Sequence, residues 1–121
     1  MAIIASHTAV LDALNEEVIF GPGEVEIYTD DTDTILLHIV ATSGTWTIAF
    51  TWSLDGVNYY SSNLFPLLGG APATSLSASA TTFNNMYTWP HSNIPYLKMK
   101  MTSYTDGVVT VNAASRRTLT R

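Results

Sequence analysis

The stretch TILLHIVATSGTWTIAFTWSLDGVN, residues 34–58, decides how the chain is expected to fold. In its second half, apolar and hydroxyl-bearing side chains alternate. Because successive side chains of a strand face opposite sides of a sheet, this alternation predicts a half-buried strand. Residues 42–44 (Thr-Ser-Gly) predict a tight turn that separates this strand from residues 34–41, and Asp-Gly at 55–56 predicts a second turn. The side chains expected on the inward face are Trp46, Ile48, Phe50 and Trp52.

The rest of the chain repeats this pattern of short alternating segments between turn residues. Further strands are expected at residues 18–20, 24–29, 57–62, 73–82, 86–89, 94–102 and 108–113, with a hairpin turn at 104–107. Residues 34–41 are apolar on both faces, as in a central strand or an interface strand. About eight short strands without a convincing long helix predict an all-β fold, an antiparallel two-sheet β-sandwich of jelly-roll or Ig-like type.

The length of 121 residues and the hydrophobic content of 46% fit one domain with its own core. We expect a β-sandwich domain at residues 18–114, an extended N-terminal arm at 1–17 and a basic C-terminal tail at 115–121. Residues 1–17 have partial helical spacing, but a lone short helix is marginal in water, so an arm or an edge strand is favoured.

Composition excludes several classes of function. There is no cysteine, hence no disulfide and no thiolate chemistry. The chain has five Lys and Arg residues, all in the last 24 positions. Five basic residues are too few to form a nucleic-acid binding surface. No segment approaches the roughly 18 to 20 continuous apolar residues of a membrane span, and the N-terminus lacks the basic region of a signal peptide.

Residues that carry chemistry are few and scattered. His7, His38 and His91 lack the spacing of metal ligands, and His38 is expected in the core or at an interface. The acidic run at 30–33 is interpreted as a solvated turn, because it lacks the glycine and distal glutamate of a calcium loop. No nucleophile elbow, phosphate loop or positioned carboxylate pair is visible. We therefore expect no enzymatic activity, no cofactor and no metal.

Several short motifs resemble those of a family of small bacteriophage virion proteins, in which Gly-Thr-Trp leads into an aromatic strand and Ser-x-Asp-Gly. The resemblance covers roughly residues 34–114. It departs at Lys98 and Lys100, where that family usually has Arg, and at Tyr59-Tyr60, where Trp often follows the Asp-Gly. The matching motifs are Gly44-Thr45-Trp46, Ser53-Leu54-Asp55-Gly56, the run 102–107 (TSYTDG) and Val109-Thr110-Val111.

This resemblance implies a virion structural protein, and the preferred hypothesis is a capsid decoration or cement protein. Such a protein would be made in the host cytoplasm and act on the capsid surface. Its expected partners are copies of itself, with a trimer favoured, and the major capsid protein or other virion proteins, but neither nucleic acid nor a membrane. Contiguous exposed apolar side chains usually mark interfaces. The residues proposed for these contacts are Val10, Leu11, Leu14, Phe65, Leu67, Leu68, Arg116 and Arg117.

An alternative hypothesis is a tail or fibre component that binds carbohydrate. Aromatic rings near turns could form a stacking platform for sugars, whereas Trp46, Phe50 and Trp52 are assigned to core packing. The residues proposed for this platform are Tyr59, Tyr60, Tyr87 and Trp89.

Overall fold

The computed structural model describes residues 2–21, 33–92 and 94–117, and the side chains of 7–21, 33–92 and 94–115. The described residues form eight strands in one antiparallel sheet and no helix, which confirms the all-β antiparallel prediction. No described helix could therefore serve as a membrane span. The strands are β1 (Ala2–Leu11), β2 (Glu17–Phe20), β3 (Thr34–Ser53), β4 (Tyr60–Ser61), β5 (Phe65–Pro66), β6 (Ser75–Pro90), β7 (Tyr96–Asp106) and β8 (Val109–Arg117).

The strand β3 is the spine of the sheet. Along one edge it pairs with β6 over almost its whole length, and with the short β4 at its end. Along its other edge it pairs first with β8 and then with β7, so these two strands follow one another in line. The outer positions are taken by β1 beside β8, β2 beside β7 and β5 beside β6.

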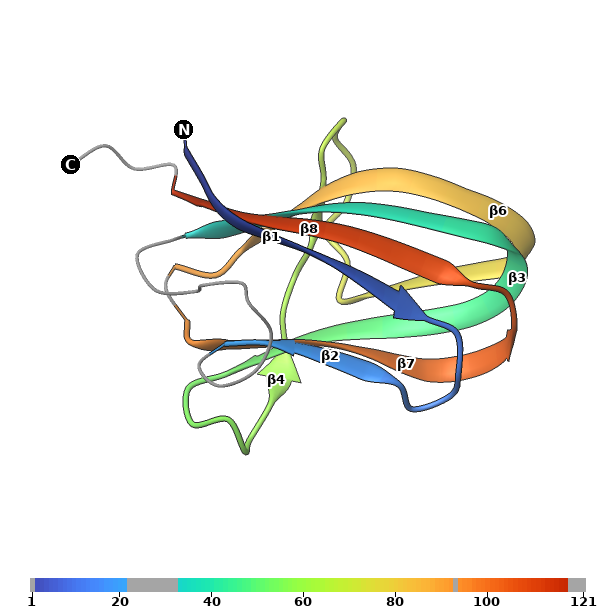
Figure 1. Cartoon of the computed structure of the whole chain (residues 1–121), viewed down its shortest axis with the longest axis horizontal. Helices are drawn as coiled ribbons and strands as arrows, with labels where there is room; N and C mark the ends of the chain where they lie inside the picture. Colours follow the sequence, from blue (N-terminus) through green and yellow to red (C-terminus); the bar gives the residue numbers. More distant parts are fainter. Residues whose placement is uncertain (1, 22–32, 93, 118–121) are drawn as a thin grey trace.

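The sheet is folded across its middle, so that its two halves face each other around the core (Figure 1). The first half contains β1, β8, the start of β3 and the end of β6, and we call it the first layer. The second layer contains β2, β7, the end of β3 and the start of β6. Hydrogen bonding continues from one layer to the other through β3 and β6, so the expected sandwich of two separate sheets is here one folded sheet.

Irregular pairing of β3 between Ala41 and Trp46 makes the fold in the sheet. Before it, the buried side chains are Ile35, Leu37 and Ile39, and after it they are Trp46, Ile48 and Phe50. The inward positions therefore change from odd to even numbers. A β-bulge has this effect, because one extra residue shifts every following side chain to the other face.

Hydroxyl and carboxylate groups replace regular backbone pairing where the sheet folds. The Ala80 N–H donates to Thr45 Oγ1 (3.0 Å), the Thr45 N–H donates to Asp106 Oδ1 (2.9 Å), and the Val108 N–H donates to Thr42 Oγ1 (3.2 Å). All three bonds lie at the exposed surface of the bend, where they link neighbouring strands. A side chain at Gly44 would place its Cβ only 2.5 Å from the Asp106 carbonyl oxygen, so the two strands can approach only at a glycine.

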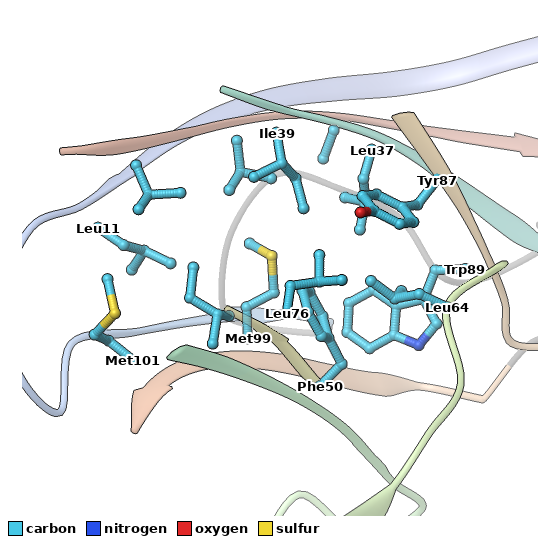
Figure 2. Packing of buried hydrophobic residues seen from close by; sticks show 14 of the residues in the cluster. Leu11, Leu37, Ile39, Phe50, Leu64, Leu76, Tyr87, Trp89, Met99 and Met101 are labelled. Carbon is cyan, nitrogen blue, oxygen red and sulfur yellow. The ribbon is translucent and has the colours of Figure 1, made fainter. Parts of the chain in front are cut away.

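The core lies between the two layers (Figure 2). Its aromatic contacts include those of Trp89, whose ring meets Phe50 edge to face at a centroid distance of 5.3 Å and Phe20 at 6.4 Å. The indole N–H of Trp89 donates to Ser62 Oγ (2.8 Å), which satisfies the polar atom of this fully buried ring. The other side chains labelled in Figure 2 are Leu11, Leu37, Ile39, Leu64, Leu76, Tyr87, Met99 and Met101.

Several expected turns are absent. Residues 42–44 do not join two strands, because β3 continues through them, and Gly44 serves close packing instead. The expected strands at 73–82 and 86–89 are one continuous strand, β6. It stays paired with β3 through the bend that joins the two layers. Residues 104–107 do not form a hairpin, because β7 and β8 pair with β3 and not with each other. The strand expected at 24–29 and most of the acidic run 30–33 lie outside the described residues.

Both ends of the described chain belong to the sheet. Most of the expected N-terminal arm is β1, an edge strand paired along its length with β8, and its Leu11 is fully buried in the core. The strand β8 continues to Arg117, past the expected start of the tail at Ser115.

Candidate interaction face and end pocket

The outer surface of the first layer carries no Asp, Glu, Lys or Arg among the described side chains, and we call it the neutral face. Strand register places its members in rows, because directly paired residues share one side of a sheet. One row runs Thr8, Asn112, His38 and Met86 across β1, β8, β3 and β6. The members assigned among the described side chains are Thr8, Val10, Leu36, His38, Val40, Phe65, Asn84, Met86, Thr88, Thr110, Asn112 and Ala114.

Polar groups in the neutral face hydrogen-bond to one another. His38 Nε2 lies 2.7 Å from Asn84 Oδ1, and the Thr8 hydroxyl donates to Asn112 Oδ1 (2.9 Å). His38 is thus a half-exposed, hydrogen-bonded residue on the outer surface of the first layer, so a core position is wrong and an interface position stays a prediction. Since these polar side chains bond laterally, the face has fewer groups that must stay hydrated, which lowers the cost of covering it.

Two shallow hollows mark this face, and both are lined by His38 and Met86. One, of about 400 Å³, is closed on its far side by the loop that contains Leu67 and Leu68. The other, of about 360 Å³, extends over Leu36 toward β1 and β8. Leu68 is fully exposed and Met86 is 46% exposed. The surface combines two hollows with exposed apolar side chains, and this combination is typical of a contact surface between proteins.

The structure brings together only part of the contact set expected from sequence. Val10 and Phe65 lie on opposite edges of the neutral face, and Leu67 and Leu68 border it. Leu14 is exposed in the connection between β1 and β2, away from this face. Leu11 is fully buried and is a core residue instead. Arg116 and Arg117 end β8, but their side chains lie outside the described part.

The outer surface of the second layer is different, and we call it the polar face. Lys98 forms an ion pair with Glu17 (Nζ to Oε2, 3.5 Å) and lies 3.9 Å from the centroid of the Tyr59 ring. These contacts are partly solvated, and such pairs contribute little to stability. The members of this face are Glu17, Ile19, Thr47, Ala49, Thr51, Ser75, Ser77, Lys98 and Lys100.

A pocket of about 440 Å³ opens at the end of the second layer, where β3 leads into β4. Trp52 pairs with Tyr60 across these strands, so both rings lie on the same side of the sheet. Trp52 is half-buried and packs against the edge of the core, while Tyr60 is 67% exposed. We call this the end pocket; its lining residues are Trp52, Ser53, Leu54, Asp55, Asn58, Tyr60 and Ile94.

The carboxylate of Asp55 organises the loop at residues 53–58, which lines part of the end pocket. Its Oδ1 accepts hydrogen bonds from the Asn58 N–H, the Val57 N–H and the Ser53 hydroxyl (2.9 Å each). Its Oδ2 accepts one from Asn58 Nδ2 (3.0 Å). The backbone N–H groups of Asn58 and Val57 favour the charged form and hold the pKa of this carboxyl well below its usual range. The expected Asp-Gly turn is therefore a carboxylate-centred loop.

The sugar platform expected from sequence is not assembled as proposed. Trp89 and Tyr87 are buried in the core, where the alternation of β6 turns them inward, so neither ring is available for stacking. Burial raises the pKa of the Tyr87 hydroxyl. Tyr59 is on the polar face beside Lys98, and Tyr60 alone reaches the end pocket. Trp52, assigned to the core from sequence, is its aromatic partner.

No group of three metal-ligating side chains occurs among the described residues. His91 is almost fully buried at the end of β6, and its backbone N–H donates to the Asp33 carbonyl oxygen (2.8 Å). Burial lowers the pKa of His91 to about 4, although the nearby charge of Asp33 acts in the opposite direction. This histidine is neutral at physiological pH, as a structural side chain would be.

No protein-family model matches this chain, and no curated protein matches it at a significant level. Solved structures with the same fold include the SPBc2 prophage-derived protein YomS, with a TM-score of 0.61 and 10% identity over 95% of this chain and 98% of that chain. They also include the PBSX exported protein XepA, with a TM-score of 0.63 and 13% identity over 95% of this chain and 39% of that chain. At these identities the likeness concerns the fold: the chain shares the folded sheet of YomS and of one part of XepA.

Proposed function

We propose that this protein is a non-enzymatic structural component of a bacteriophage virion, and specifically a capsid decoration protein that joins copies of itself and of the major capsid protein. The neutral face is the observation that carries this proposal. A phage origin is supported by the shared fold with YomS, which is described as prophage-derived, and by the sequence motifs of small virion proteins.

The neutral face supports association because covering its described side chains buries no Asp, Glu, Lys or Arg. Its apolar members gain free energy when they leave water, at roughly 25 cal/mol per Å². Its lateral hydrogen bonds, such as His38 to Asn84, remain intact in a complex. Repetition over the many subunits of a capsid converts modest affinity per contact into strong overall attachment.

The strand β1 offers a second mode of attachment. Within the described sheet it has a neighbour on one side only, so no described strand pairs with its other edge. An extended segment of a capsid subunit would add to that edge by main-chain hydrogen bonds. This replaces the expected free arm, since removing residues 1–17 would also remove the core residue Leu11.

A pair of substitutions on one strand tests the role of the neutral face. Met86→Glu places a charge on this face, and Ser77→Glu places the same charge on the polar face; both positions are exposed on β6. We expect the unmodified protein to form a closed oligomer, a trimer by preference, in light scattering. Met86→Glu should shift it to monomer, and Ser77→Glu should not.

Co-sedimentation with capsids of the same phage that lack the protein completes the test. Binding by the unmodified protein and by Ser77→Glu, with loss in Met86→Glu, would support decoration through this face. A monomer that leaves such capsids undecorated would refute the proposal, and equal binding by all three proteins would exclude the neutral face as the contact.

A further inference from the structure

We propose that the end pocket is a binding site for a neutral pyranose unit of a glycan, with Trp52 and Tyr60 as its stacking surfaces and Asn58 as its polar contact. This inference does not depend on the role in the virion proposed above. It rests on the size of the pocket, on the pairing of two aromatic side chains and on the polar groups between them.

The aromatic part of the pocket is positioned by the sheet. Register fixes Trp52 opposite Tyr60, and both line the pocket. A pyranose has one face made largely of C–H groups, which packs well against aromatic rings and removes apolar surface from water. Trp52 is held by its contacts with the core, so little side-chain entropy is lost when a ligand stacks on it.

The polar part of the pocket is positioned by the Asp55 loop. One N–H of the Asn58 amide donates to Asp55 Oδ2, which orients the amide. Its second N–H and its oxygen have no hydrogen-bond partner among the described residues, so they can donate to and accept from sugar hydroxyls. Orientation by a neighbouring hydrogen bond is how binding sites keep a polar contact in place before the ligand arrives.

The charge of the pocket selects among ligands. Asp55 is its only ionisable acid, Lys, Arg and His being absent from the lining. That carboxylate already accepts hydrogen bonds from Ser53, Val57 and Asn58. A phosphate or a uronic acid would meet a negative charge without a cation to pair with it, whereas a neutral hydroxylated ring would not. The volume of about 440 Å³ is suited to one sugar ring rather than a long chain.

Tryptophan fluorescence provides a direct measurement, because Trp46 and Trp89 are at most 1% exposed and Trp52 is half-buried in the pocket. The probes are methyl glycosides of glucose, galactose, mannose and N-acetylglucosamine, with methyl glucuronide as the anionic comparison. For at least one neutral glycoside we expect a saturable change with a dissociation constant of roughly 1 mM, as small ligands of this size allow. Methyl glucuronide should give none.

Variants locate the site. Tyr60→Ala should weaken binding about 5-fold or more, as loss of an aromatic contact worth ~1 kcal/mol predicts. Asn58→Ala should weaken it by a similar factor. Phe65→Ala removes an exposed ring from the first layer and should leave binding unchanged. Since Trp52 contributes to the core, the exposed Tyr60 is the decisive position.

Saturation-transfer NMR on the unmodified protein gives an independent readout. Ring C–H protons of the bound glycoside should receive more saturation than its O-methyl group. The absence of a saturable response to every neutral glycoside would overturn the proposal. Binding that is equal in Tyr60→Ala and in the unmodified protein, or stronger for methyl glucuronide than for methyl glucoside, would overturn it as well.

Discussion

At the scale of single residues, several side chains with well-defined hydrogen bonds or ring contacts stabilise the fold. Asp55 gathers backbone and side-chain donors into one loop, and Trp89 joins the two layers through its rings and its bond to Ser62. His91 is buried beside Asp33 and has a lowered pKa. Each of these residues has a role in stability that can be measured.

Replacing the carboxylate of Asp55 should loosen the loop that forms the end pocket. Asp55→Ala removes both carboxylate acceptors, leaves Ser53 Oγ as the side-chain acceptor for the Asp55 and Gly56 N–H groups, and should lower the melting temperature. Asp55→Asn keeps the oxygen that accepts from the backbone but loses the bond from Asn58 Nδ2, so its effect should be smaller. Thermal denaturation followed by circular dichroism measures both. Equal melting temperatures for all three proteins would show that the loop is held by other contacts.

The buried His91 should make the protein less stable in acid. Its pKa is about 4 in the folded state and about 6.5 in the unfolded chain, so the unfolded state takes up the proton first. The contribution of neutral His91 to the free energy of unfolding is therefore fully present above about pH 6.5. It is lost as the pH decreases to about 4, and protonation of this group causes no further loss below that. The shift corresponds to a loss of about 3 kcal/mol. Urea unfolding of the wild type and His91→Gln at several pH values measures it; equal pH dependence would contradict the assignment.

At the scale of elements, the long strand β3 and its bulged middle determine the architecture. A regular strand would have continued as a flat sheet with Ile35 and Trp46 on opposite faces. The bulge puts both side chains in one core, and Gly44 lets β3 approach the end of β7. The strands β3 and β6 thus continue from one layer into the other, while short connections take the chain from β1 to β2 and from β7 to β8.

Gly44→Ala should be strongly destabilising, because its Cβ would lie 2.5 Å from the Asp106 carbonyl oxygen and 2.7 Å from Gly107 Cα. These are backbone atoms and cannot move aside by rotation. We expect a loss of roughly 2 kcal/mol or more, as for other overpacked sites. Ser43→Ala, at the adjacent exposed position, is the control and should change stability by less than about 0.5 kcal/mol. Similar unfolding midpoints for the two variants would refute this role.

The sequence was sufficient to predict strands, their alternation and most of the inward residues, because period-two patterns are local. Trp46, Ile48 and Phe50 lie inward as expected. The fold of the sheet was not predictable, since Thr-Ser-Gly is equally suited to a turn and to a bulge, and the choice depends on strands β6 and β7, which are distant in sequence. Trp52 continues the inward alternation but reaches the open end of the layer, which only the register with β4 reveals.

At the scale of the whole molecule, the two outer faces divide the charges unevenly. The described Lys and Glu side chains that pair with one another lie on the polar face, and the neutral face has none. If subunits associate through the neutral face, attraction between them is mainly apolar. Salt screens exposed charges within about 10 Å at 0.1 M, and it has little effect on apolar burial.

The association of subunits should therefore change less than about 3-fold between roughly 0.05 and 0.5 M sodium chloride. Sedimentation velocity over a series of protein concentrations measures the association constant at each salt concentration. A steep loss of association with salt would indicate contacts through charged groups. It would contradict association through the neutral face and favour contacts through the basic residues near the end of the sequence.

The pairing of β1 with β8 also has a consequence for how the protein is made. On the ribosome, Leu11 is synthesised about 100 residues ahead of β8, the strand that completes its layer. At about 5 to 20 residues per second, roughly 5 to 20 seconds pass before β8 emerges. Until then the nascent chain must keep an apolar strand away from other chains, so folding of the first layer begins only after β8 has emerged. A host chaperone that shields nascent β1 would therefore raise the yield of native protein more than one that acts after release.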